Sequence, residues 1–126
     1  MFSQIYSATV AVADQDRALE FYVGMLGWEK VMDAPFGDGR RWLTVMPPGA
    51  ATVLVLAGRD WDEWAAPLSG GGDTGITLVT PDIEATYATL SELGVAFRAP
   101  VTTLEWGQKG TWFSDPDGNE FFLVEA

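Results

Sequence analysis

Hydrophobic and polar residues alternate along most of this chain, and in two places the alternation gives way to the spacing of a helix. Residues 7–13 alternate with a period of two, which predicts a strand. The segment DRALEFYVGML that follows carries apolar residues at helical spacing, so it predicts an amphipathic helix. Asp14 is of a residue type that caps helix N-termini, and Gly27 is of the type that ends helices.

The second half of the chain repeats this unit. Residues 75–80 predict a strand, Asp82 a helix cap, IEATYATLSEL a helix and Gly94 its end. The spacing between cap and ending glycine differs by only one residue between the two copies. An internal repeat of this kind indicates a fold made of two equivalent structural units.

Each predicted helix is followed by three further strand-like runs. These runs are WEKVMDA, RRWLTVMP and ATVLVLA in the first half, and VAFRAPVTT, GTWFSDP and EFFLVEA in the second. We therefore predict a single α+β domain over residues 1–126, built from two tandem β-α-β-β-β modules with eight strands in total. The modules are expected at approximately 1–57 and 75–126, with a glycine-rich linker at 58–74.

The charge balance argues against two classes of partner. The chain has 7 Lys and Arg residues against 18 Asp and Glu, which gives a formal net charge of -11 at pH 7. Such a charge repels phosphate backbones and anionic lipid head groups, so we expect neither nucleic acid nor a membrane as a partner. No apolar run approaches the ~18 residues of a membrane span, and there is no cysteine, which together favour a cytoplasmic protein.

Three segments make the sequence resemble a known superfamily. They are TVAVADQDRALEFYVGMLGWE near the start, PDIEATYATLSELGV in the middle and FSDPDGNEFFLVE at the end. In this order and spacing they are similar to the vicinal oxygen chelate superfamily, which includes glyoxalase I, extradiol dioxygenases, fosfomycin-resistance enzymes and bleomycin-resistance proteins. The resemblance implies a fold with a concave sheet in each module and a cup that holds a metal or a ligand.

The resemblance also implies where metal ligands stand in the metal-dependent members. The corresponding positions here are Ser7, one residue within 53–55, Gly75 and Phe122, and the chain contains no histidine. Divalent metals need converging N or O donors, so we expect no metal and no other cofactor. An all-oxygen site would have to use the carboxylates near the last hairpin, which are Glu105, Glu120 and Glu125. Strand alternation separates two of these, so this site is the weaker alternative.

Six tryptophans point instead to aromatic binding surfaces. The segments PFGDGRRW and LEWGQKGTW occupy equivalent places in the two halves, and each joins glycines to a large aromatic residue and a charge. This composition suits the rim of an adjustable pocket, and equally an ordinary hairpin turn. The predicted ligand-binding residues are Phe36, Asp38, Trp42, Glu105, Trp106, Trp112 and Phe122, with Asp33 as a further anionic contact. Trp61 and Trp64 are expected to pack the linker or a dimer contact.

The leading hypothesis is a metal-independent protein similar to the bleomycin-resistance branch, with no catalytic residue. It would sequester a planar aromatic molecule, cationic or neutral, such as an antibiotic. The alternative is a lyase or dioxygenase-type enzyme with an atypical metal or acid–base site, and a regulatory or structural subunit is a third reading. Free sheet edges and the apolar linker further predict a two-fold homodimer that buries more than ~1,000 Å².

Overall fold

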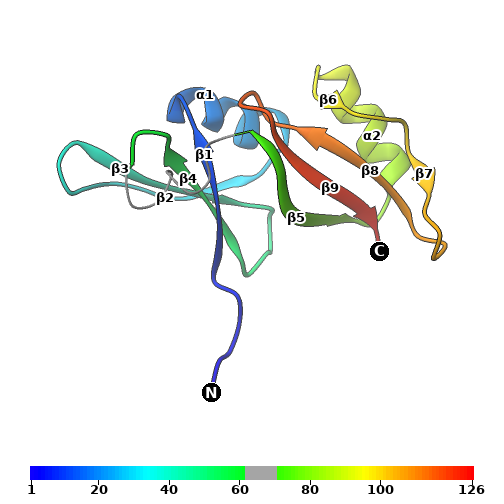
Figure 1. Cartoon of the computed structure of the whole chain (residues 1–126), viewed down its shortest axis with the longest axis horizontal. Coiled ribbons are helices and arrows are strands. Elements are labelled where there is room, and N and C mark those ends of the chain that lie inside the picture. The colour runs from blue at the N-terminus through cyan, green and yellow to red at the C-terminus, as the bar shows by residue number, and fades with distance from the viewer. Residues whose placement is uncertain (62–70) are drawn as a thin grey trace. The chain divides into compact units, whose positions relative to one another are not determined.

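The computed structural model describes residues 1–61 and 71–126 (Figure 1). The chain divides into two compact units, Met1–Gly70 and Gly71–Ala126, and the division falls within the segment predicted to be the linker. Most of that segment, including Trp64, lies outside the described residues. Each unit contains its own sheet, so each is described by itself.

The first unit is a four-stranded sheet with the strand order β1-β4-β3-β2. All four strands occur where the alternation predicts them: β1 (Ser7–Val12), β2 (Glu29–Phe36), β3 (Arg40–Met46) and β4 (Val53–Gly58). β1 and β4 run parallel, whereas the other neighbours are antiparallel. Because β1 and β4 are paired residue by residue, Ala11 lies beside Ala57 and Ser7 beside Val53.

The helical segment of the first unit begins as predicted but changes its hydrogen bonding midway. The Asp14 carboxylate accepts hydrogen bonds from the backbone N–H groups of Asp16 and Arg17, at 3.0 and 3.1 Å, and so caps α1 (Gln15–Leu19). The expected single helix then continues as the π-helix η1 (Glu20–Met25), which ends before Gly27 at φ 75°. Phe21 and Tyr22 on η1 are buried and touch edge to face at 5.0 Å.

The second unit is a five-stranded sheet with the order β5-β9-β8-β6, in which β7 also pairs with β8. Its elements are β5 (Gly72–Thr80), α2 (Ile83–Glu92), β6 (Ala96–Phe97), β7 (Thr102–Thr103), β8 (Lys109–Ser114) and β9 (Asn119–Glu125). The Asp82 carboxylate accepts from the Ala85 N–H at 3.1 Å and caps α2, as predicted. No helix within the described residues is long and apolar enough to cross a membrane.

Two details of the second unit differ from the prediction. β5 begins at Gly72, three residues before the expected start of the module. The run 95–103 was predicted as one strand but forms the two short strands β6 and β7, so the described residues contain nine strands instead of eight. The interruption contains Pro100, which has no N–H for a strand ladder. The neighbouring Ala99 carbonyl accepts from the Thr111 hydroxyl at 2.6 Å.

From Asn119 to Leu123, successive residues of β9 alternate between a buried and a half-buried face of the second sheet. Phe121 is fully buried and stacks on Phe113 at 5.4 Å, on the face that α2 covers in Figure 1. Phe122, the next residue, is half-buried and points to the opposite face. This alternation separates the core of the unit from the face that carries the candidate site.

Candidate functional site

One face of the first sheet carries a cluster of three aromatic rings. Phe36 lies at the end of β2, Trp42 on β3 and Trp61 just after β4. The Phe36 ring meets Trp42 at 5.5 Å and Trp61 at 5.0 Å, both edge to face, and the two indoles lie nearly parallel at 6.3 Å. The cluster packs on Ala11 and Ala57, whose small side chains leave space for the rings. The structure therefore brings two predicted residues, Phe36 and Trp42, together with Trp61.

The half-buried face of the second sheet carries a second aromatic surface. Trp112 on β8 and Phe122 on β9 are cross-strand neighbours, and their rings stack at 4.7 Å. The Arg98 guanidinium lies 4.3 Å from the centroid of Trp112, and its Nε is 3.5 Å from Glu120 Oε2. Two predicted residues thus form one flat apolar layer, with a positive and a negative side chain beside it.

Glu105 and Trp106 lie in the turn before β8. Both are exposed, and Trp106 retains 67% of its accessible surface. Its indole N–H donates to Gln108 Oε1 at 2.9 Å, while Gln108 Nε2 donates to the Glu125 carbonyl at 2.9 Å. The turn therefore presents an indole that is held in place yet open to solvent.

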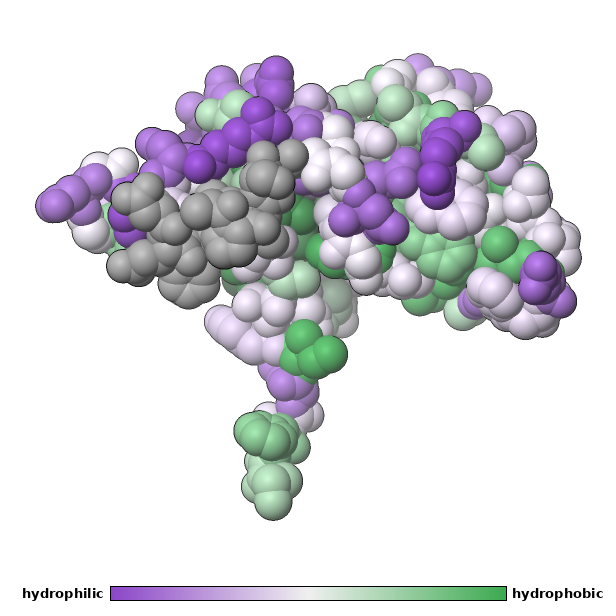
Figure 2. All heavy atoms as spheres, viewed as in Figure 1, coloured by the Kyte–Doolittle hydropathy of each residue, from purple (hydrophilic) through white to green (hydrophobic). Residues whose placement is uncertain are grey.

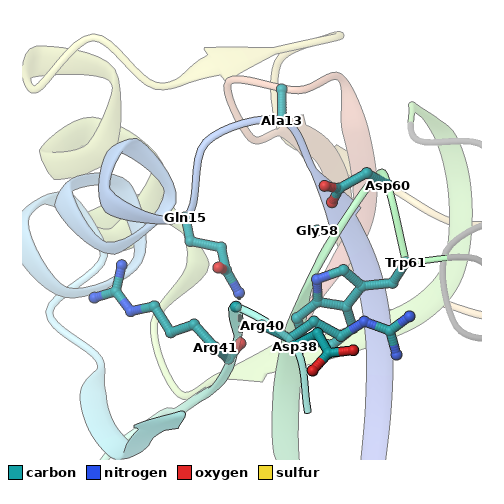
Figure 3. Close-up of a pocket in the computed structure, with 9 residues that line it drawn as sticks. Ala13, Gln15, Asp38, Arg40, Arg41, Gly58, Asp60 and Trp61 are labelled. Atoms are coloured by element: carbon teal, nitrogen blue, oxygen red, sulfur yellow. Dashed lines mark hydrogen bonds between the residues drawn. The ribbon is translucent and has the colours of Figure 1, made fainter. Parts of the chain in front are cut away.

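Asp38 lies in the turn between β2 and β3, where it helps to line a polar pocket of about 360 Å³ (Figure 3). The other lining residues come from the segment after β1, the start of α1, the same turn, the start of β3, and the end of β4 with the residues that follow it. They are Ala13, Gln15, Gly39, Arg40, Arg41, Gly58, Asp60 and Trp61. Trp61 belongs to both the aromatic cluster and this pocket.

Arg41 is held in place by two carboxylates. Its Nη1 is 2.7 Å from Asp16 Oδ1, and its Nε and Nη2 donate to the two oxygens of Asp33 at 2.7 and 2.8 Å. This bidentate contact is the main cause that lowers the pKa of Asp33 to about 2, and the two carboxylates in turn raise the pKa of Arg41. Asp33 was predicted as an anionic ligand contact, but its carboxylate is already paired with the Arg41 guanidinium.

We expect the Asp33 carboxyl to titrate with a midpoint of about 2 and to return toward ~3.9 in Arg41→Gln. Because its pKa falls on folding, the pair stabilises the fold above about pH 4, and this contribution is lost as the pH falls toward the folded pKa. An NMR titration of the carboxyl carbon measures both values, with Arg40→Gln as the matched control. An unchanged Asp33 pKa in Arg41→Gln contradicts the assignment.

The sequence and the fold together identify the family. The family model described as Glyoxalase/Bleomycin resistance protein/Dioxygenase superfamily matches residues 4–123. The chain belongs to this superfamily. A superfamily member from Sphaerobacter thermophilus DSM 20745 has a similar structure, with a TM-score of 0.92 and 50% identity over 99% of this chain and 98% of that one.

Two further relatives of the superfamily cover nearly the whole chain. TnmS3, an antibiotic binding protein from Streptomyces sp. CB03234, has a TM-score of 0.82 and 37% identity, over 98% of this chain and 96% of that one. The uncharacterized protein YetH of Bacillus subtilis (strain 168) is 34% identical over 125 residues, which span 99% of this chain and 100% of YetH. These likenesses agree with the resemblance predicted from the three sequence segments.

The residues at the positions where the resemblance predicts metal ligands do not fit a metal. Ser7 begins β1 beside buried Val53, and Gly75 adopts φ 71° within an irregular part of β5. Phe122 stacks on Trp112. Ser7 offers one hydroxyl, Gly75 has no side chain and Phe122 has only an apolar ring, whereas a divalent metal needs several N or O donors. Within residues 1–61 and 71–126, no three His, Cys, Asp or Glu side chains form a group that could hold a metal ion.

The carboxylates of the last strand are directed to different places. Glu120 pairs with Arg98 on the face of Phe122, as strand alternation predicts. Glu125 Oε2 accepts from the Ile83 N–H at 3.1 Å, at the start of α2. Each carboxylate therefore serves a neighbouring positive charge or helix end, and β9 does not gather them into one cation site.

The sequence analysis missed two residues that the structure brings to the aromatic surfaces. Arg98 was not singled out, although it is the single basic residue in the run VAFRAPVTT. Trp61 was assigned to the linker or a dimer contact, yet it packs on Phe36 and Trp42. Its position only four residues beyond the predicted strand run ATVLVLA was the available signal.

Proposed function

We propose that this protein binds a planar aromatic small molecule, such as an antibiotic, and sequesters it without a metal. The observation that carries the proposal is the Trp112 and Phe122 stack. The sequence resemblance predicts that Phe122 takes the place of a metal ligand in the final strand. Aromatic rings favour offset stacking on one another, so this surface is suited to a flat ring system. The Phe36, Trp42 and Trp61 cluster supplies further aromatic surface in the first unit.

The charges beside the stack refine the proposed ligand. Arg98 lies over Trp112 at 4.3 Å, and its side chain is 55% exposed, so a long and mobile guanidinium is available to an incoming ligand. A guanidinium disfavours a second positive charge at the same place and favours an oxygen acceptor. We therefore propose a neutral or anionic aromatic ring for the second unit, in place of the cationic ring included in the sequence-based hypothesis.

The relatives support this proposal. TnmS3, at 37% identity and a TM-score of 0.82, is an antibiotic binding protein. This likeness extends over 98% of the chain and supports a similar role for this protein. Because one fold carries several functions, the residues of the candidate site decide between binding and catalysis. The aromatic surface of this chain and the antibiotic binding of this relative both favour binding over catalysis.

The test is a titration of the protein with a panel of planar antibiotics, followed by tryptophan fluorescence. We expect quenching or a spectral shift, and we expect Trp112→Leu to weaken the affinity about tenfold because one stacking face is lost. Trp28→Phe is the matched control, because Trp28 packs against Tyr22 at 5.4 Å, within the helical layer of the first unit. No response to any compound at roughly 100 μM contradicts the proposal.

The enzyme alternative has its own readout. Metal analysis of protein purified without chelator, combined with activity assays before and after addition of Mn, Fe, Ni or Zn, separates the two functions. Stoichiometric metal that supports turnover would overturn the proposed metal-independent binding. The same result would require ligands other than Ser7, Gly75 and Phe122.

We also propose that the protein acts as a homodimer. The segment 1–6 extends away from the sheet of its unit (Figure 1) and protrudes from the surface (Figure 2), and its Phe2 and Ile5 keep 98% and 75% of their accessible surface. Its base is fixed, because the Val53 N–H donates to the Tyr6 carbonyl at 3.0 Å and the Thr52 hydroxyl to the Ile5 carbonyl at 2.7 Å. Large apolar side chains on an anchored arm are typical of a contact with a partner.

Sedimentation velocity at low micromolar concentration is expected to give a species of twice the chain mass of 13.7 kDa. Phe2→Ser combined with Ile5→Ser should shift it toward monomer, because both substitutions remove apolar surface from an interface of more than ~1,000 Å². Val79→Ser, a change at a 63% exposed apolar residue of β5, is the comparison. A clean monomer for the unmodified protein contradicts the dimer.

A further inference from the structure

The polar pocket of the first unit has features that aromatic stacking does not use. Its volume of about 360 Å³ lies within the range of small-molecule sites, about 300–1,000 Å³. Two of its walls are fixed by the protein itself. Arg41 points away from the pocket centre toward its carboxylate partners, and Gln15 Nε2 donates to the carbonyls of Arg41 and Leu56 at 2.9 and 2.8 Å (Figure 3). These contacts give the pocket a preformed shape.

Two carboxylates in the lining remain available. Asp38 and Asp60 form no ion pair with any residue in the part of the chain that the structure describes. The nearby Arg40 is directed at the Phe36 ring, with its Cζ 5.9 Å from the ring centroid. The net charge of -11 adds a general attraction for cations. The available charge in the pocket is therefore negative.

Trp61 provides a second and independent feature. It is only 3% exposed, its indole N–H points into the pocket in Figure 3, and no described residue accepts that hydrogen. The rest of the side chain is packed, so this N–H faces the open space of the pocket and is available to a ligand oxygen. Gly58 keeps the space in front of it open, because a Cβ there would lie 2.7 Å from Trp61 Nε1 and 2.9 Å from Asp60 Oδ1. The donor and the carboxylate thus border the same small space.

We propose that this pocket is a separate binding site for a small organic cation that also carries an oxygen acceptor. Its ammonium or guanidinium group would be held by the Asp60 carboxylate, and its hydroxyl or carbonyl oxygen would accept the hydrogen bond of the Trp61 indole. Asp38, on the other side of the indole in Figure 3, would add to the negative charge of the pocket. The charge-assisted hydrogen bonds from the ligand cation to the carboxylate supply most of the affinity. The Trp61 indole N–H favours ligands that carry an oxygen acceptor. The site is distinct from the Trp112 and Phe122 surface and does not depend on the aromatic ligand.

The probe for the test is glucosamine in its protonated form, with N-acetylglucosamine and glucose as uncharged counterparts. Two-dimensional ¹H–¹⁵N NMR resolves the indole N–H signals, and Trp61→Phe identifies the signal of Trp61. We expect glucosamine to shift this signal in a saturable manner, whereas the two neutral sugars should need at least about tenfold higher concentrations. An unmoved Trp61 signal at roughly 10 mM glucosamine, or an equal response to all three sugars, overturns the proposal.

Two variants test the residues. Asp38→Asn combined with Asp60→Asn should weaken glucosamine binding about tenfold or more and leave the fold intact, because both residues are exposed. Gly58→Ala should block the site by steric contact with Trp61. Glu92→Gln, which removes a charge at the end of α2, is the control. Unchanged affinity in the double variant contradicts the proposal.

The planar-antibiotic titration separates this site from the proposed function. Asp60→Asn alone should respond to the aromatic panel like the unmodified protein, because Asp60 belongs to neither aromatic surface. If glucosamine binds and no aromatic compound does, the proposed function fails and the cation site stands. If an aromatic compound binds and glucosamine does not, the proposed function stands and the cation site fails.

Discussion

Replacing Asp115 with alanine is expected to lower the free energy of unfolding by about 3 kcal/mol, because its buried carboxylate holds the DPDGN turn together. Asp115 is 5% exposed. Its Oδ1 accepts from the backbone N–H groups of Asp117 and Asn119, and its Oδ2 accepts from Asn119 Nδ2, all at 2.9 Å. Alanine removes the acceptor that satisfies these three donors, and the turn that connects β8 to β9 loses its main support.

Urea unfolding followed by circular dichroism measures this loss. Asp73→Ala is the matched control, because Asp73 is an exposed carboxylate in the same unit that accepts one hydrogen bond, from the Gly75 N–H at 2.9 Å. We expect the control to cost less than about 1 kcal/mol, since solvent replaces the lost acceptor. A loss in Asp115→Ala as small as that of the control would show that the turn does not depend on the carboxylate.

Local signals in the sequence predicted much of this fold. The cap residues Asp14 and Asp82 make the hydrogen bonds expected of them, because capping depends on atoms only two or three residues away. The strands of the first unit follow from alternation for the same reason. Even the DPDGN motif, recognised as part of a family pattern, rests on contacts between residues two to four positions apart.

Features that depend on pairing between distant segments could not be predicted in the same way. The stack of Trp112 on Phe122 requires a particular register of β8 against β9, and the position of Arg98 over Trp112 depends on how the run 95–103 is interrupted. The π-helical turn η1 also has no sign in the sequence, because its apolar spacing resembles that of an α-helix. The candidate site was therefore predicted as a set of aromatic residues and not as two defined surfaces.

Phe121→Ala is expected to destabilise the protein by about 3–5 kcal/mol, the typical cost of deleting a buried aromatic ring. Phe121 has no accessible surface, and its ring stacks on Phe113 at 5.4 Å, within the face covered by α2. Its removal leaves a cavity that the neighbouring strands cannot close without losing their pairing. Thermal and chemical unfolding measure the effect, and the variant is expected to be only marginally folded at 37 °C.

The adjacent substitution Phe122→Ala is the sharpest comparison, because it removes the same ring from the same strand on the opposite face. Phe122 is half-buried and contacts Trp112, so its loss should cost only about 1 kcal/mol of stability. It should instead weaken binding of a planar aromatic ligand about tenfold, since half of the stacking surface is gone. If Phe122→Ala destabilises the protein as much as Phe121→Ala and leaves ligand binding unchanged, then this face of β9 belongs to the core, and Trp112 and Phe122 do not form a ligand surface.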